Sequence, residues 1–591
     1  MLNFYDFEVF KMDWLVVIIN PIDQTETVIV NDPDTLRDYY NSHKEEIWIG
    51  YNSRRYDQYI LKAILCGFDP KKVNDWIIVE DRQGWMFSNL LRKYPLNNYD
   101  VMTSFHGLKQ LEGFMGNNIK ETSVPFDLNR KLTAEEIAET IKYCKHDVEQ
   151  TMEVFLERKA DFDAHMSLIK TFDLPLNYIT KTKAQLSATI LQCEKTKYDD
   201  EWNITFVDTL RLEKYKHIMD WYKNPLNRNY DKVLEVMVAG VPHVFGWGGL
   251  HGAIEKYHGT GLIVHVDVTS YYPSLMIIYN LLTRSCKHPE LFKQIYDKRV
   301  ALKKAGKKKE QAPYKIILNG TFGICKDKMN PAYDPLQANN ICINGQLLLL
   351  DLIEHLEVID GFELIQSNTD GLIVKIPNSQ KAFDELDDIC FEWEQRTHMG
   401  LGFDYIKEIY QKDVNNYLFI QDDGYVETKG AYVKSLNNLD YDLPIINKAL
   451  VDYMVKKVPI EKTINECDSL KDFQKIIKIS SKYLKGLKGY DPVKNISRIK
   501  KIVTYTDSRF EELNDKTFRV FASNSESDGA IYKLKTINSK AEKFANTPER
   551  CFIENGDINN MKIPSKLDKQ WYIDLAYKRL NDFGIEGGQN E

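Results

Sequence analysis

One stretch of the sequence places an acidic side chain at a bend between two apolar runs. Residues 364–376 read LIQSNTDGLIVKI, so that Asn368, Asp370 and Gly371 lie where two strands would reverse direction. Asn, Asp and Gly favour any tight hairpin turn, and turn chemistry alone therefore predicts an ordinary surface hairpin. Asp370 becomes a candidate metal-binding carboxylate only if another part of the chain supplies a partner.

Two acidic residues near the N-terminus share one face of a strand. The stretch DFE places Asp6 and Glu8 two residues apart, and side chains with this spacing point to the same side of a strand. Two carboxylates held together repel each other unless a cation lies between them. A lone D-x-E pair is more often simply exposed, so the interpretation depends on further acidic residues.

Two later stretches supply such residues. NSRRYDQYIL places Asp57 at the start of a helical pattern, five residues after Asn52, and YCKHD places Tyr143 and Asp147 four residues apart on one helix face. In this order and in an α/β context, the stretches resemble the DEDD 3′–5′ exonucleases with a catalytic tyrosine, which have an RNase H-like fold and proofread for DNA polymerases. The resemblance implies that four carboxylates bind two divalent metal ions: Asp6, Glu8, Asp57 and Asp147. Tyr143 would orient the attacking water, and Asn52 would contact the frayed single strand.

A second acidic position follows an apolar strand pattern. HVDVTSYYPSLM puts Asp267 at the end of this strand, before a tight Tyr-Tyr-Pro-Ser turn. The stretch resembles the first palm motif of family B DNA polymerases. The resemblance implies that Asp267 and the Val268 carbonyl bind metal and that Tyr272 lies under the sugar of the incoming nucleotide. A flat ring there leaves no room for a 2′-hydroxyl and would favour dNTPs over rNTPs.

The stretch KIILNGTFG resembles the fingers motif of the same family. Lys315 and Asn319 lie on one helix face, with Phe322 a turn further. Lys315 would meet the triphosphate as a mobile point charge, a role suited to lysine, and Phe322, in place of a tyrosine, would keep a stacking face for the base pair. Arg299 and Lys303 on the preceding helical run are further candidates for phosphate contacts, although lysine-rich runs are equally often solvated surface.

The resemblance also gives Asp370 its partner. The strand-turn-strand around it matches the third motif of the family, Y-x-D-T-D-S, and would bring it beside Asp267 on the palm sheet. Here the pattern reads Q-S-N-T-D-G, so Asn368 replaces an aspartate. An asparagine can offer a carbonyl oxygen to a metal-bound water or to a nearby Lys or Arg without adding charge. We therefore expect the site to be active as written, with Asn368 supporting the metal ligands.

The patterns between these residues predict a multidomain fold of the α/β and α+β classes. At 591 residues the chain is too long for one core. The first 35 residues read as antiparallel strands, and later helical patterns include one with Thr133 and Glu136 at the spacing of a capping box. The resemblance assigns 1–170 to an RNase H-like exonuclease, 171–260 to a linker and the start of the palm, 261–290 to the palm, 291–325 to a helical hairpin of the fingers, and 326–440 to the palm. Position and charge alone predict that 441–591 form a thumb and C-terminal DNA-gripping region.

Charge is distributed unevenly along the chain. The net charge of −8 counts mildly against a nucleic-acid binder, but residues 298–309 and 481–501 are strongly basic. TKGAYVK resembles the segment that grips a primer terminus in family B polymerases, which makes Lys429 and Tyr432 candidate DNA contacts.

Nine cysteines without a C-x-x-C pair argue against a zinc site, an iron–sulfur cluster or a disulfide framework. No apolar run approaches the ~20 residues of a membrane span, and the N-terminus lacks a signal-peptide pattern, so we expect a cytoplasmic protein, in the host cytoplasm if viral.

These patterns together predict a family B DNA polymerase with proofreading, of the compact bacteriophage type. Its expected partners are primer–template DNA and dNTPs, with no membrane; its expected cofactor is Mg²⁺, two ions per active site, with Mn²⁺ as a substitute; and its expected state is a monomer. The short spacings between the palm motifs favour an ordinary nucleic-acid primer. Two alternatives stay open: a 3′–5′ exonuclease for repair or recombination with a degenerate polymerase half, and a DNA-binding scaffold without chemistry.

Overall fold

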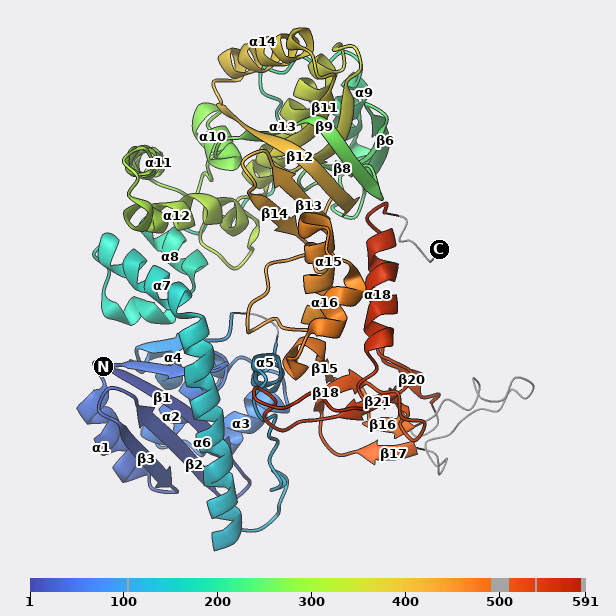
Figure 1. Ribbon diagram of the computed structural model, residues 1–591. Helices are drawn as coiled ribbons and strands as arrows, with labels where there is room; N and C mark the ends of the chain where they lie inside the picture. Colours follow the sequence, from blue (N-terminus) through green and yellow to red (C-terminus); the bar gives the residue numbers. More distant parts are fainter. Residues whose placement is uncertain (104–105, 490–509, 537–538, 586–591) are drawn as a thin grey trace. The chain divides into compact units, whose positions relative to one another are not determined.

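The computed structural model describes residues 1–103, 106–489, 510–536 and 539–585 (Figure 1). The chain is a mixed α/β multidomain protein with several sheets, and it divides into two compact units. We call the first the nuclease-side unit: the described residues of Met1–Thr180, Leu436–Ile446 and Glu461–Ile573. The second, the palm-side unit, comprises Lys181–Ser435, Asn447–Ile460 and the described residues from Asp574 onward.

The nuclease-side unit contains a five-stranded mixed sheet with the order β3-β2-β1-β4-β5. Its strands are β1 (Leu2–Val9), β2 (Trp14–Asn20), β3 (Thr25–Val30), β4 (Ile47–Gly50) and β5 (Asn98–Asp100). The first three strands pair antiparallel, which confirms the prediction for the N-terminal residues, whereas β4 runs parallel to both β1 and β5. The central strand β1 is buried along most of its length, as expected of a strand covered on both faces.

Helices cover this sheet, and their ends follow local capping rules. They are α1 (Pro33–His43), α2 (Asp57–Leu65), α3 (Pro70–Ile78), α4 (Asn89–Lys93), α5 (Leu108–Met115), α6 (Ala134–Glu157) and α7 (Lys159–Thr171). The predicted capping box of α6 is confirmed, because Thr133 and Glu136 each accept a hydrogen bond from the other's backbone N–H. α6 packs on β1 and β2 through an apolar face that includes Cys144 and Val148 (Figure 1).

Two small sheets from the C-terminal part of the chain belong to the same unit. The first has the order β15-β18-β21, and its strands are β15 (Lys475–Lys478), β18 (Thr517–Ala522) and β21 (Cys551–Ile553). The second has the order β17-β16-β19-β20, and its strands are β17 (Phe510–Leu513), β16 (Lys485–Gly489), β19 (Ala530–Leu534) and β20 (Glu542–Lys543). The first sheet packs on α5. The fully buried Arg519 of β18 donates to the carbonyls of Gly113 and Asn117 and to Gln474 Oε1. Burial lowers the pKa of this guanidinium to about 10.

The palm-side unit is built on a nine-stranded sheet with the order β14-β13-β12-β9-β11-β10-β8-β7-β6. Its strands are β6 (Leu234–Val238), β7 (Val241–Phe245), β8 (His251–Ala253), β9 (Tyr257–Val268), β10 (Glu363–Asn368), β11 (Gly371–Ile376), β12 (Leu401–Asp413), β13 (Asn416–Gln421) and β14 (Val426–Lys429). The apolar strand expected before Asp267 is the second half of β9, and the expected hairpin around Asp370 is β10–β11. β9 pairs antiparallel with both β11 and β12, which makes it an interior strand of the sheet.

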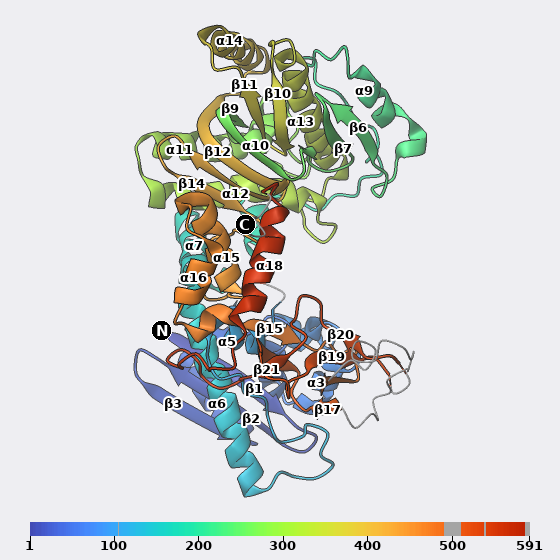
Figure 2. The same cartoon turned by 45° about the vertical axis from the view of Figure 1, so that its right-hand side comes forward.

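Helices of the palm-side unit cover the sheet and form the predicted lysine-rich hairpin. They are α8 (Lys183–Ile190), α9 (Lys216–Lys223), α10 (Tyr271–Ile278), α11 (Pro289–Lys304), α12 (Lys308–Lys326), α13 (Pro335–Leu356) and α14 (Gln380–Thr397). Figure 2 shows α13 beside β10 and β11. α13 is buried over most of its length, and Trp393 of α14 donates its indole N–H to the Leu348 carbonyl. The helices α11 and α12 pack against each other, which confirms the helical hairpin.

The region expected to form a thumb begins with α15 (Pro444–Lys456) and α16 (Ile460–Glu466) and ends with α18 (Lys569–Asn581). Its residues are divided between the two units, most of them belonging to the nuclease-side unit. The thumb assignment itself stays a prediction, and residues 490–501 of the basic run lie outside the described residues. Among the described helices, none combines the length and the apolar character that a membrane span requires.

Candidate active sites

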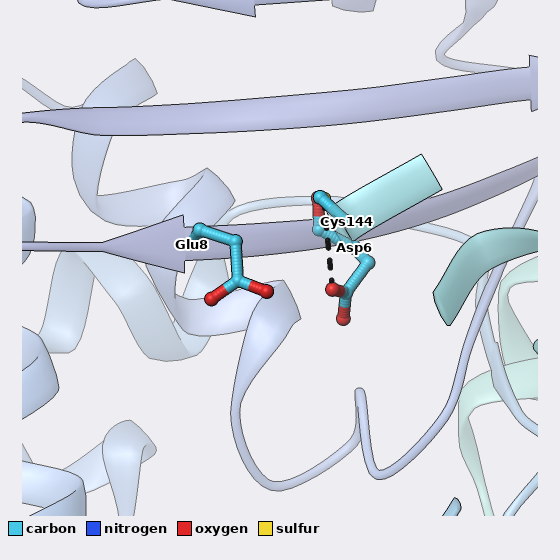
Figure 3. A group of neighbouring side chains, drawn as sticks. All are labelled: Asp6, Glu8 and Cys144. Carbon is cyan, nitrogen blue, oxygen red and sulfur yellow. Dashed lines mark hydrogen bonds between the residues drawn. The ribbon is translucent and has the colours of Figure 1, made fainter. Parts of the chain in front are cut away.

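The nuclease-side unit gathers acidic side chains beside the central strand β1. Asp6 and Glu8 point to the same side of β1, as Figure 3 shows. Asp57 is the first residue of α2, and its Oδ1 accepts a hydrogen bond from the backbone N–H of Phe7 at 3.2 Å. This bond anchors the start of α2 against the strand between the two acidic residues.

Asp147 joins this group from α6, and its charge raises the pKa of the other three carboxyl groups. Burial raises the pKa of Asp6, and the charges of Asp57, Glu8 and Asp147 raise it further. Burial, and then the charges of Asp147 and Asp57, raise the pKa of Glu8. For Asp57, burial is the main cause of a pKa raised to about 7. Such mutual repulsion is relieved when cations bind, and oxygen ligands of this kind suit Mg²⁺.

Cys144 of α6 contacts this acidic cluster, and the sequence patterns did not select it. Ligand atoms of Asp6, Glu8 and Cys144 lie within 4.8 Å of one another. The buried thiol donates to the Asp6 backbone carbonyl at 3.3 Å and approaches Asp6 Oδ2 at 3.6 Å (Figure 3). Burial and then the Asp6 charge raise the pKa of Cys144 well above its usual value. A thiol that stays protonated orients Asp6 and is a poor metal ligand.

A lysine that the sequence analysis missed lies within this acidic cluster. Lys109 of α5 forms ion pairs with Asp147 and, at 3.1 Å, with the fully buried Glu112, and its ammonium lies 4.7 Å from the centre of the Tyr143 ring. Burial lowers the pKa of Lys109, but the carboxylates of Asp147 and Glu112 outweigh burial and raise it overall. The i, i+3 spacing of Lys109 and Glu112 predicts only a helix-surface pair, so local sequence gave no sign of the contact with α6.

The predicted tyrosine and asparagine of this site differ in their surroundings. Burial and then the charges of Asp147 and Glu8 raise the pKa of Tyr143 far above its usual value, so its phenol stays protonated. Asn52 lies in the loop before α2 with a left-handed φ of 59°, and its carbonyl accepts hydrogen bonds from the backbone of Arg55 and Tyr56. Its contact with DNA stays a prediction.

The palm-side unit brings Asp267 and Asp370 together across two strands. Gly371 pairs with Asp267 in the β9–β11 register, and the Val268 N–H donates to the Asp370 carbonyl at 2.8 Å. Burial raises the pKa of Asp267 to about 7, and the charge of Asp370 raises it in turn. Burial also raises the pKa of Asp370, although its backbone hydrogen bond and the charges of His265 and Lys429 act in the opposite direction.

A cavity of about 340 Å³ opens beside these two carboxylates, a size typical of small-ligand sites. Five further residues that the sequence analysis selected line it: Val268, Tyr272, Arg299, Lys315 and Asn319. Arg299 is buried and donates to Ser270 Oγ at 2.6 Å, which fixes one side of its guanidinium. The ring of Phe322 lies 4.5 Å from that of Tyr272. The exposed Lys303 is not part of the lining, but its charge lowers the pKa of Asp267.

Asn368 lies at the end of β10, next to the cavity lining. Its side-chain amide donates to the Val414 carbonyl at 3.3 Å, and the Thr369 hydroxyl is 3.4 Å from its Oδ1. Thr369, with a left-handed φ of 45°, forms the turn that presents Asp370. The hydrogen bond to the Val414 backbone therefore holds the side chain of Asn368. The expected role of Asn368 in supporting the metal ligands stays a prediction.

The two candidate primer contacts lie on and after β14. Lys429 approaches the Tyr417 ring to 5.8 Å, and its charge lowers the pKa of Asp370, so it lies near the β10–β11 hairpin. Two cations lie near the ring of Tyr432. The Arg579 guanidinium is 4.6 Å from the ring centre, and the Lys412 ammonium is 5.7 Å from it. The roles of Lys429 and Tyr432 toward DNA stay predictions.

His265 and Asp404 are polar residues near Asp370 that the sequence patterns did not select. They are register partners on β9 and β12, with His265 Nδ1 3.7 Å from an Asp404 carboxylate oxygen. A Cβ atom at Gly371 would lie 3.0 Å from His265 Nε2. The glycine that replaces the serine of the family pattern thus leaves room for the imidazole.

Comparisons with known proteins give little beyond these observations. No family model matches the sequence, and no curated protein matches it. Among solved structures, the chain is similar to the family B DNA polymerase from the hyperthermophilic archaeon Pyrobaculum calidifontis, with 13% sequence identity and a TM-score of 0.42 over 100% of this chain and 78% of the other. A similarity this low fixes neither the fold nor the activity of the present chain.

Proposed function

We propose that the chain is a template-directed, DNA-dependent DNA polymerase of family B with a 3′–5′ proofreading exonuclease, of the compact bacteriophage type. One observation carries the proposal. Asp267 and Asp370, more than 100 residues apart in the chain, border one cavity that the cations of Lys315 and Arg299 also line. Carboxylates and cations around one cavity suit a metal-bound triphosphate, whose negative charge requires both.

In the polymerase reaction, the side chains of this cavity would position the nucleotide. Asp267, Asp370 and the Val268 carbonyl are the oxygen donors that would hold Mg²⁺, which when bound supplies charge neutralisation at the reacting phosphate. Lys315 and Arg299 would bind the phosphates. Arg299 is pre-oriented for this role by its hydrogen bond to Ser270, so little side-chain entropy is lost on binding.

In the nuclease reaction, the cluster beside β1 would hold the terminal nucleotide. Its four carboxylates would bind Mg²⁺, and the protonated phenol of Tyr143 would orient a water at the scissile phosphate. Lys109 holds Asp147 in place and offsets part of the negative charge. The mixed five-stranded sheet with these residues on and around its central strand supports an RNase H-like fold for this region. The α11–α12 pair supports the assignment of the fingers.

One alternative keeps the nuclease and drops the polymerase. Gln366, Asn368 and Gly371 depart from the third motif of the family, and Asn368 contributes no negative charge at the hairpin. This favours a 3′–5′ exonuclease of repair or recombination with a degenerate polymerase half. The two carboxylates that remain are sufficient to bridge metal ions, so we prefer the polymerase.

A primer-extension assay with Mg²⁺, with and without dNTPs, tests the proposal. A polymerase with proofreading lengthens the primer when dNTPs are present and shortens it when they are absent. Shortening under both conditions would support the degenerate-polymerase alternative, and binding without either reaction would leave only a scaffold. Asp370→Asn serves as the matched control for extension, and Asp6→Ala with Glu8→Ala serves for shortening.

A further inference from the structure

A second cavity of the nuclease-side unit lies next to the acidic cluster. It measures about 450 Å³, and Lys109 and Tyr143 are part of its lining. Its other walls come from residues 121–126 and from the edge of the β15–β18 sheet. Two parts of the chain that are about 350 residues apart in sequence therefore build one groove, which ends at the residues of the proposed nuclease site.

Specific contacts hold the C-terminal wall of this groove in place. The carboxylate of Glu121 accepts hydrogen bonds from the backbone N–H groups of Lys516 and Thr517, at 2.9 and 3.0 Å. Thr517 is the register partner of Lys478 on β15. The side chains of Lys478 and Lys516 consequently line the groove from a sheet that the buried Arg519 fastens to α5.

The groove combines positive charge with an exposed aromatic ring. Lys478 and Lys516 are both exposed, and within the described part of the chain no ion pair joins either of them to a carboxylate. Phe126 is 44% exposed and stacks on the buried Phe10, with ring centres 5.0 Å apart and an interplanar angle of 21°. One ring face thus packs on the core, and the rest of the ring stays partly accessible. Lysines beside an accessible aromatic ring form the arrangement that binds single-stranded nucleic acid.

We propose that this groove binds the single-stranded nucleotides that lead to the nuclease site, with phosphates on Lys478 and Lys516 and a base on Phe126. The proposal rests on the proposed exonuclease function and adds to it a binding surface contributed by the C-terminal sheet. The chemistry selects a flexible polyanion with stacking bases, because the cations lie on one wall and the aromatic ring on another. A paired duplex would leave no base face free for Phe126.

The first experiment measures single-strand digestion by the full-length double variant Lys478→Ala with Lys516→Ala. With oligothymidylate and Mg²⁺, kcat/KM falls about 10-fold at low salt, and the slope of log kcat/KM against log salt becomes shallower by about 1.4, since each phosphate contact to a single strand contributes ~0.7. Replacement of both lysines by arginine preserves the slope. The matched control is Lys44→Ala with Lys72→Ala, two exposed lysines of the same unit that do not line the groove, and it leaves digestion unchanged.

A second measurement separates stacking from charge. Binding of fluorescently labelled pentathymidylate is followed by anisotropy in EDTA, so that no digestion occurs. Phe126→Ala weakens binding about 10-fold without a change in salt slope, because base stacking is nearly independent of ionic strength. Equal thermal unfolding midpoints for this variant and the parent show that the Phe10 contact is not needed for folding.

The outcomes distinguish this groove from the nuclease assignment. If the parent protein digests single strands and the double lysine variant retains both the rate and the salt slope, the groove proposal is overturned and the nuclease proposal stands. If the parent does not digest DNA, yet loses pentathymidylate affinity on substitution of the two lysines, the groove is supported and the nuclease function fails. Loss of neither property on substitution overturns the groove in either case.

Discussion

The two acidic sites of this protein differ in how cationic side chains offset the repulsion between their carboxylates. Beside β1, four carboxylates crowd together, and the unit supplies its own cation, Lys109, paired to Asp147. On the nine-stranded sheet only Asp267 and Asp370 meet, and the cations Lys315 and Arg299 line the same cavity without an ion pair to either carboxylate among the described residues.

The difference follows from what each site is proposed to receive. A phosphodiester brings one negative charge per phosphate, so a dense carboxylate cluster can still accept it once metal ions are bound. A triphosphate brings several charges, so a site with fewer carboxylates and separate cations repels it less. An asparagine at position 368 thus keeps the negative charge of the site low, because a third carboxylate would bind metal but would also repel the triphosphate.

The largest expected effect separates the two sites completely. Asp6→Ala with Glu8→Ala abolishes 3′–5′ digestion of single-stranded DNA and leaves extension largely intact, whereas Asp370→Asn abolishes extension, because each change removes metal-binding charge from one site. Digestion and extension are assayed on the same purified variants after circular dichroism has shown that they are folded. Loss of both activities in a folded Asp6, Glu8 double variant would contradict two separate sites.

Asn368 tests whether the palm site works with two carboxylates. Asn368→Ala lowers single-nucleotide insertion by about 10–100-fold at saturating Mg²⁺, the usual loss when a group supporting metal ligands is removed. Asn368→Asp stays active, with an altered preference between Mg²⁺ and Mn²⁺. If Asn368→Ala is as inactive as Asp370→Asn, the asparagine is itself a ligand and the supporting role is wrong.

Tyr272 tests selection of the sugar, which only the palm site requires. Tyr272→Ala raises incorporation of rNTPs relative to dNTPs by about 10-fold or more, because steric exclusion of the 2′-hydroxyl is lost. Insertion kinetics with dATP and ATP measure the ratio, and Tyr272→Phe, which keeps the ring, is the control. An unchanged ratio in an active alanine variant would move the gate to another residue.

The smallest expected effect is on stability in the absence of metal. The pKa of Asp57 is raised to about 7 in the folded protein from ~3.9 in an unfolded chain. A raised carboxyl pKa contributes stability that is present below pH ~4 and is lost as the pH rises through about 7. In EDTA the midpoint of thermal unfolding therefore falls by roughly 3 °C between pH 5 and pH 8, and Mg²⁺ restores it at pH 8.

A matched variant assigns this pH effect to the cluster. Asp57→Asn keeps the shape of the side chain and removes its titration, so the fall in the unfolding midpoint between pH 5 and pH 8 becomes smaller than in the parent protein. Scanning calorimetry in EDTA measures both proteins. A fall of the same size in Asp57→Asn would show that other groups cause it.

The sequence alone determined the local elements and much of the chemistry. Alternating and continuous apolar runs predicted β1, β2, β3 and β9, and the Thr133–Glu136 spacing predicted the start of α6, because these features depend on residues only a few positions apart. The type and order of the acidic residues, together with the family resemblance, selected side chains that the structure brings close together.

Only the tertiary structure decided how distant segments complete each site. Lys109 meets Asp147 because α5 and α6 pack side by side, and Arg519 joins the C-terminal sheet to α5 from about 400 residues away. The thumb expected from 441 onward is likewise divided between the units, and most of it belongs to the unit that contains the N-terminal sheet. Periodicity and spacing report which face of an element is buried, but not which element buries it, since that choice depends on the packing of the whole chain.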